Sequence, residues 1–307
     1  MRISGLDGLR LIAMLCVVSV HIGGADNTIE IGAWDAIRAL GRWAVPFFFM
    51  LSGFFLLNPV SERAFSRIVP IWIFSNLMFL PPRLYIHGFS SLSTGFLTSG
   101  TWFHLWFVSS LIFGISILAW VDRKSIPSAI LIAIATMIIL GAWLADYRFT
   151  ISPSGQGAMQ LFRFLSALPC LYIGRWLRAN IDSLTATAGL LLLAAGMTAI
   201  LAQLYLQHTA RAQFEMQLIP GGYVSAIGAV IVGAKISVPK LFSDLGRYHS
   251  LPIYILHPFF ILVFSSYLST AQLFAASFAT SLLFSITLQK ISPRIFFLLS
   301  GELRETK

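Results

Sequence analysis

Long apolar runs follow one another through almost the whole chain, and no other feature constrains its fold as strongly. A helix that spans a lipid bilayer needs about 20 mostly apolar residues. Runs of this kind lie at residues 8–24, 38–57, 67–86, 103–121, 126–145, 158–177, 184–206, 217–236, 248–267 and 271–298. The 307-residue chain is 57% hydrophobic and only 11% charged, which leaves too little polar surface to face water all round. The sequence therefore predicts an all-α, polytopic membrane helix bundle of about ten transmembrane helices, with residues 1–307 forming a single domain.

The basic residues predict an orientation, because lysine and arginine concentrate in cytoplasmic loops. If the N-terminus is inside, the outer side receives only Arg38, Arg42, Arg83, Arg148, Arg163 and Arg211. The cytoplasmic side receives Arg2, Arg10, Arg63, Arg67, Arg123, Lys124, Arg175, Arg178, Lys235, Lys240, Arg247, Lys290, Arg294, Arg304 and Lys307. This division of 15 against 6 among the 21 basic residues predicts that both termini are cytoplasmic. It also explains the net charge of +9 without a nucleic-acid partner, and none is expected.

Six ionisable side chains are the candidates for a place at membrane depth, where an unpaired charge costs several kcal/mol. They are Arg10, His21, Arg42, Arg67, His104 and His257. Arg10 and His21 are eleven residues apart on the first expected helix. At about 100° and 1.5 Å per residue, they would share a helix face to within about 20° and lie roughly 16 Å apart. We expect both to point into one cavity. The alternative is an interfacial anchor at Arg10 and a hydrogen-bonded core histidine at His21.

Arg63 and Arg67 are one turn apart at the cytoplasmic start of the third expected helix. Two guanidiniums on one face suit a phosphate group, which they can hold through bidentate, charge-assisted contacts. The alternative is the cytoplasmic preference of basic residues, which needs no ligand. This alternative is favoured for Arg63, whereas Arg67 lies further inside the apolar run.

The remaining candidates have competing structural interpretations. Arg42 opens an aromatic stretch with a structural role, and Gly53 near its end permits close helix approach. His104 begins the fourth expected helix, where a belt of interfacial aromatic residues is the alternative. His257 precedes Pro258, and a helix-kink histidine is the favoured interpretation there. The sequence has no zinc-ligand spacing and no phosphate-binding glycine loop, so no metal is expected.

Four motifs, in order along the chain, resemble those of the acyltransferase-3 family of membrane O-acyltransferases. GLDGLR at residues 5–10, followed after ten further residues by His21, is similar to the family's opening motif. The stretch 42–54 resembles its FF-x-LSGF helix, and residues 104–107 resemble its HLWF segment. LGRYHSLPIYILHP at 245–258 resembles its late S-x-x-IY-x-x-HP segment. The sequence RWAVPFFFMLSG is most similar to the branch that contains surface-polysaccharide O-acetyltransferases.

The resemblance implies transfer of an acyl group, usually acetyl from cytoplasmic acetyl-CoA, to a hydroxyl of a cell-envelope glycan or lipid-linked saccharide. It also implies an integral protein of the bacterial cytoplasmic (inner) membrane. The family's first-helix arginine and histidine fall on Arg10 and His21 of this chain. Its basic pair falls only loosely on Arg63 and Arg67, because the family often has a tighter spacing there.

The mechanistic hypothesis assigns the chemistry to His21 and the binding of acetyl-CoA to arginines. His21 would act as general base on the hydroxyl, or as a nucleophile that first accepts the acetyl group. Arg10, Arg67 and Arg63 would hold the phosphates of coenzyme A. Asp7, three residues before Arg10, would orient its guanidinium.

Arg42 and His104 lie at the outer end of their helices and are candidates for contact with the acceptor. A secondary transporter, such as an exporter of lipid-linked sugar, is the rival class. It would share the helix count and the buried basic residues. A non-catalytic scaffold is a third possibility, but it does not explain why Arg10 and His21 share one helix face.

Overall fold

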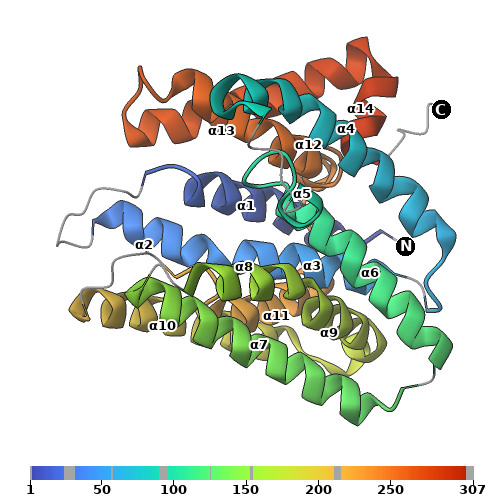
Figure 1. Ribbon diagram of the computed structural model, residues 1–307. Coiled ribbons are helices and arrows are strands. Elements are labelled where there is room, and N and C mark those ends of the chain that lie inside the picture. Colours follow the sequence, from blue (N-terminus) through green and yellow to red (C-terminus); the bar gives the residue numbers. More distant parts are fainter. Residues whose placement is uncertain are drawn as a thin grey trace.

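The computed structural model describes residues 2–23, 32–56, 58–89, 96–124, 126–152, 155–210 and 216–301, and every regular element in these ranges is helical (Figure 1). The α-helices are α1 (Ser4–Val20), α2 (Ala33–Leu40), α3 (Ala44–Phe55), α4 (Glu62–His87), α5 (Phe96–Ser99), α6 (Trp106–Lys124), α7 (Ser128–Ile151), α8 (Gln156–Leu165), α9 (Ala167–Asn180), α10 (Ala186–Thr209), α11 (Pro220–Lys235), α12 (Lys240–Phe264), α13 (Thr270–Ile291) and α14 (Pro293–Ser300). Short 3-10 helices occur at η1 (Gly41–Trp43) and η4 (Ile181–Ser183). The all-α prediction is confirmed.

Each of the ten apolar runs overlaps at least one helix, but three of the runs are broken. The run 38–57 contains the end of α2, then η1 and α3. The run 158–177 is divided at Ser166 between α8 and α9. The run 271–298 is divided at Ser292, because Pro293 cannot donate the N–H that would continue α13 and instead begins α14.

Among the described residues, five helices are long and apolar enough to cross a membrane: α4, α6, α7, α10 and α13. These helices indicate an integral membrane protein. The helices α1 and α11 have only 17 and 16 residues, and α12 has 25 but carries polar side chains such as Arg247 and His257. The count of ten spans and the cytoplasmic termini stay predictions. Arg211, Arg304 and Lys307, which entered the orientation, lie outside the described residues.

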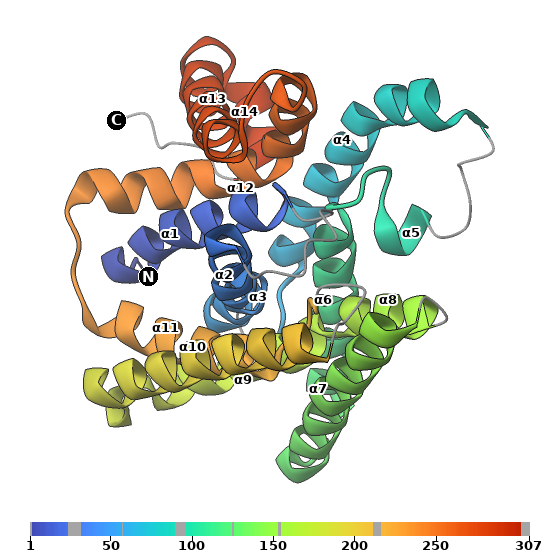
Figure 2. The ribbon, with the colours of Figure 1, turned by 90° about the vertical axis from the view of Figure 1, so that its left-hand side faces the viewer.

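The helix α1 lies inside the bundle, between α12 on one side and α3 and α11 on the other (Figure 2). Around this centre, α10 packs along α11, α9 along α3, and α13 along α12. The largest fully buried side chains include Leu6 and Met14 of α1 and Phe47, Phe49 and Met50 of α3. Side chains on α1 and α3 therefore face mainly protein, and a polar group there meets other residues of the chain.

Two glycines allow helix backbones to touch near the candidate site. A Cβ on Gly53 of α3 would lie 2.1 Å from the carbonyl oxygen of Leu171 in α9, which confirms the expected close approach. A Cβ on Gly246 of α12 would lie 1.8 Å from the carbonyl oxygen of Asp7 in α1. This second contact brings the start of α12 against the start of α1, and so places Arg247 beside the first helix.

Candidate functional site

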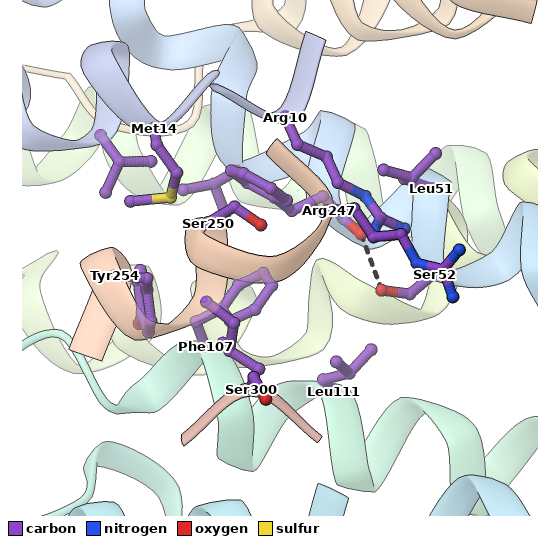
Figure 3. Close-up of a pocket in the computed structure, with 14 residues that line it drawn as sticks. Arg10, Met14, Leu51, Ser52, Phe107, Leu111, Arg247, Ser250, Tyr254 and Ser300 are labelled. Atoms are coloured by element: carbon purple, nitrogen blue, oxygen red, sulfur yellow. Dashed lines mark hydrogen bonds between the residues drawn. The ribbon is translucent and has the colours of Figure 1, made fainter. Parts of the chain in front are cut away.

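A cavity lies against one face of α1, where Arg10, Met14 and Val17 follow one another at helical spacing. Its other walls come from α3, α6, α12 and α14, and Figure 3 shows Arg10 and Arg247 extending toward the same end, near Ser52. The rest of the lining is mostly apolar and comprises Val45, Phe48, Leu51, Phe107, Leu111 and Leu251, together with Ser250, Tyr254 and Ser300. The volume is about 210 Å³. We call this space the Arg10 cavity.

The guanidinium of Arg10 is held in place by a carboxylate on its own helix. Nη1 of Arg10 lies 3.3 Å from Oδ1 of Asp7, three residues earlier. Asp7 is only 4% exposed, and its second oxygen lies 3.7 Å from Nε of Arg2. The ring of Phe55 also faces Arg10, with its centroid 5.7 Å from Cζ. The contact that the orienting role of Asp7 requires is therefore present, while the role itself stays a prediction.

Arg247 is the site residue that the sequence argument missed. It lies within the segment 245–258, but it counted there only as one of the cytoplasmic basic residues. In the structure it lines the Arg10 cavity, with its Cζ 5.3 Å from the ring centroid of Tyr248. The sequence feature that could have indicated this role is the preceding Gly246. It permits the contact with α1 that brings the two arginines to one end of the cavity.

Arg63 and Arg67 lie in the first two turns of α4, and both are exposed. Neither of them lines the Arg10 cavity. The helix α4 packs against α14, whose Ser300 does line it. The assignment of Arg63 and Arg67 to coenzyme A phosphates stays a prediction, and it would require contacts outside this cavity.

Three histidines from distant parts of the chain form one cluster. His21 ends α1, His104 precedes α6, and His257 lies in α12. Nε2 of His257 is 3.1 Å from Nδ1 of His21, and the ring centroids are 5.0 Å apart. The ring of His104 is 5.7 Å from that of His257. None of these three histidines lines the Arg10 cavity, so the structure does not place Arg10 and His21 in one cavity as expected. The cluster adjoins the cavity, since His21 Nδ1 is 2.8 Å from the carbonyl oxygen of Val17 and His257 packs near Tyr254. The interpretation of His257 as a kink histidine overlooked this pairing.

The contacts of the pair assign its tautomers. A carbonyl oxygen only accepts hydrogen bonds, so an imidazole nitrogen that faces one carries a proton. His21 Nδ1 faces the Val17 carbonyl, and His257 Nδ1 lies 3.1 Å from the carbonyl of Ile253. Because His257 is fully buried and a charge there is costly, it is neutral and its Nε2 accepts from His21 Nδ1–H. We infer that the basic lone pair of His21 is on Nε2. This arrangement suits a general base or a nucleophile.

His104 is 1% exposed, and neither of its ring nitrogens makes a hydrogen bond of normal geometry with a described residue. Its backbone carbonyl accepts a hydrogen bond from the hydroxyl of Tyr254. The ring also interacts with the backbone of Ile255, which leaves its other nitrogen as the candidate contact to a bound molecule. The predicted contact between His104 and the acceptor is not tested by this geometry and stays a prediction.

Arg42 does not line the Arg10 cavity but belongs to a second pocket, together with Arg163 of α8. We call it the Arg163 pocket. Val17 and Val45 line both spaces, so these two side chains form the wall between them. His21 interacts electrostatically with both arginines. The sequence placed Arg42 at the acceptor end, but it gave Arg163 no role beyond the charge count.

The comparisons with known proteins establish the family. The model of the acyltransferase domain matches residues 3–290, and the chain belongs to the acyltransferase-3 family. This match covers nearly the whole chain and includes all three histidines and both arginines of the Arg10 cavity.

Similarity to curated relatives is partial. An amino-acid racemase of Enterococcus faecalis is 31% identical over 47% of this chain and 22% of its own length. A serine/alanine racemase of Enterococcus gallinarum is 32% identical over 37% of this chain and 19% of its own length. The chain thus spans about a fifth of the length of the curated relatives that it matches, and racemase activity is not carried over from them. No solved structure matches the chain.

Proposed function

We propose that this protein is an O-acyltransferase of the bacterial inner membrane that moves an acetyl group from cytoplasmic acetyl-CoA to a hydroxyl of a cell-envelope glycan. The observation that carries the proposal is the hydrogen-bonded pair of His21 and His257, adjoining a cavity whose other end holds two arginines. A basic nitrogen and an anion-binding end are the two groups that such a transfer requires.

The arginines account for binding of the donor. Arg10 and Arg247 present two guanidiniums at one end of the cavity, an arrangement suited to phosphate oxygens. Sites that enclose a whole small molecule have volumes of roughly 300–1,000 Å³. The Arg10 cavity, at about 210 Å³, suits the narrow pantetheine arm, with the nucleotide outside it. Arg63 and Arg67, exposed on α4, are proposed to contact that outer part.

His21 supplies the chemistry. Its Nε2 takes the proton from the acceptor hydroxyl as the oxygen attacks the thioester carbonyl carbon. The carbon–sulfur bond then breaks, and His21 returns the proton to the sulfur of coenzyme A. General-base catalysis of this kind contributes about 10²–10⁴-fold to the rate. The hydrogen bond to His257 holds the ring in the tautomer that leaves Nε2 basic.

A second route uses the same nitrogen as nucleophile. Nε2 of His21 attacks the thioester, coenzyme A leaves, and the acceptor hydroxyl then takes the acetyl group from the imidazole. The two routes differ in one observable species. Only the second forms acetylated protein when acceptor is omitted, so rapid quenching with labelled acetyl-CoA separates them.

The test of the function is acetyl transfer by the purified protein in nanodiscs, with acetyl-labelled acetyl-CoA and envelope glycan fractions. We expect coenzyme A release together with a labelled glycan. A lipid-linked-sugar exporter would consume no thioester. If no glycan fraction led to release of coenzyme A, the proposal would be contradicted. Comparing envelope glycan acetylation in cells with and without the gene identifies the acceptor.

A further inference from the structure

The Arg163 pocket lies on the far side of the Val17–Val45 wall and has a different lining from the Arg10 cavity. It is built from α1, η1, α3, α6, α8, α11 and the segment 216–219. Two guanidiniums, an indole, an amide and two hydroxyls face it, from Arg42, Arg163, Trp106, Gln217, Ser166 and Tyr223. Apolar side chains, among them Val20, Pro46 and Ile219, complete the lining. With a volume of about 50 Å³, the pocket suits a small polar group such as an oxyanion.

Arg163 is held by neutral groups. Its Nη1 donates to Oε1 of Gln217 at 3.2 Å, and its Cζ lies 4.8 Å from the ring centroid of Trp106. The carboxylate that interacts with it electrostatically is Asp146, and Arg42 adds a second positive charge. Asp146 Oδ2 already accepts the backbone N–H groups of Gln217 and the next residue, both at 2.6 Å. The guanidinium is thus fixed in orientation, and its direct contacts are to neutral groups.

Tyr223 provides a second observation in the same pocket. It is 4% exposed, and its hydroxyl makes no hydrogen bond of normal geometry with a described residue. The neighbouring hydroxyl of Ser166 donates instead to the carbonyl oxygen of Arg163, at 2.6 Å. The Tyr223 hydroxyl also interacts with the Ser166 side chain, but a bound oxyanion would be a stronger acceptor for it. The tyrosine is therefore a ready donor beside Arg163.

The pocket is also close to the proposed catalytic base. Val17, whose carbonyl faces His21 Nδ1, lines the pocket, and so does Val20 beside His21 in the sequence. Arg42 and Arg163 both interact electrostatically with His21. A ligand anchored on Arg163 would therefore extend toward the histidine cluster from the side opposite to the Arg10 cavity.

We propose that the Arg163 pocket binds an oxyanion of the acceptor, a carboxylate or a phosphate, and thereby holds a neighbouring hydroxyl near His21. Arg163 and Arg42 contact the oxyanion and Tyr223 donates to it, while the saccharide ring lies outside the pocket. The acceptor is then an acidic saccharide or a saccharide joined to a lipid phosphate. This inference rests on the proposed acetyl transfer for the acceptor's role, but the anion site can be tested without turnover.

The test is binding of two matched probes to the protein in nanodiscs, measured by calorimetry. Methyl glucuronoside carries a carboxylate, and methyl glucoside is its neutral counterpart. We expect the wild type to bind the glucuronoside more tightly by roughly tenfold or more, the effect of one charge-assisted hydrogen bond. Arg163→Gln should abolish this preference. Arg148→Gln is the control, because Arg148 is exposed near the end of α7 and does not line the pocket.

A parallel arm distinguishes the source of the oxyanion. Thermal stability is compared in nanodiscs with and without a polyprenyl phosphate, which stabilises the protein if it binds the folded state. The oxyanion is assigned to a lipid phosphate if polyprenyl phosphate stabilises the wild type but not Arg163→Gln, and if the wild type shows no preference for the glucuronoside. A preference for the glucuronoside assigns it to the saccharide. Either result supports the pocket.

The proposal is overturned if neither anion binds better than its neutral control, or if the preference survives both Arg163→Gln and Arg42→Gln. Unfolding curves accompany each variant, and Arg42→Gln carries the test if Arg163→Gln does not fold. An anion preference in a protein without acetyl transfer would refute the proposed function while supporting the anion site. Acetyl transfer without an anion preference would support the proposed function and refute the anion site.

Discussion

The Arg10 cavity and the Arg163 pocket share the wall formed by Val17 and Val45, yet each holds its arginine in a different way. Arg10 is paired directly with the carboxylate of Asp7, at 3.3 Å. Arg163 hydrogen-bonds to an amide and stacks on an indole. Both linings are mostly apolar, but the Arg10 cavity has a volume of about 210 Å³ and the Arg163 pocket one of about 50 Å³.

This difference suggests a division between the two substrates. A guanidinium that is already paired is oriented but partly neutralised, so a second arginine, Arg247, is needed to bind several phosphates. A guanidinium held by neutral groups keeps its charge for a single oxyanion. In the proposed function, the larger cavity takes the acyl-carrying arm and the smaller pocket takes the oxyanion of the acceptor. His21 lines neither space but adjoins both through Val17, and we propose it as the point of transfer.

Replacing His21 should have the largest effect. His21→Ala removes the basic nitrogen but leaves both arginines of the Arg10 cavity, so turnover should fall at least about 10²-fold while coenzyme A affinity is unchanged. Acetyl-transfer rates and calorimetry on the same nanodisc preparation measure the two quantities. His87→Ala, at the exposed end of α4, is the control. Near-normal turnover of a folded His21→Ala protein would remove the catalytic assignment.

Arg247→Ala should weaken coenzyme A binding by roughly tenfold, the loss of one charge-assisted hydrogen bond to phosphate. A high concentration of acetyl-CoA should then restore most of the turnover. Arg123→Ala, exposed near the end of α6, is the matched control. If Arg247→Ala lowered kcat without changing coenzyme A affinity, the arginine would act on the reaction itself and the division between the spaces would be wrong.

His257 is a positioning residue, and its effect should fall on kcat alone. His257→Ala removes one of the two acceptors that face His21 Nδ1–H, the other being the Val17 carbonyl, and should lower kcat by up to about tenfold, the equivalent of one hydrogen bond. His257→Gln offers an amide oxygen at a similar place and should recover part of the rate. A residue that only packs the helix would show no difference between the two variants at equal thermal stability.

Arg67→Ala should have the smallest effect, because an exposed side chain contributes little through a solvated ion pair. We expect the KM for acetyl-CoA to rise by a few-fold while the acceptor KM stays the same. Arg67→Lys should rescue this only partly, since lysine cannot bind a phosphate bidentately. An unchanged KM for acetyl-CoA would leave Arg67 with its topological role alone.

The features that sequence reasoning predicted are those that depend on neighbours along the chain. Apolar runs specify helices locally, and the spacing of Asp7 and Arg10 specifies a pair on one helix face. His257 and Arg163 were missed for the opposite reason. The hydrogen bond between His257 and His21 joins residues 236 positions apart, and it exists only because α12 packs against α1. Arg163 meets its pocket through a similar packing of α8 with distant segments.

The most direct test of two separate substrate spaces is to measure two affinities on two variants. Coenzyme A and the acidic probe that binds the wild type are each titrated into Arg10→Ala and Arg163→Gln proteins in nanodiscs. We predict that Arg10→Ala loses affinity for coenzyme A alone and that Arg163→Gln loses affinity for the acidic probe alone. Loss of the same ligand in both folded variants would show that the two arginines serve one site, and would contradict the division of donor from acceptor.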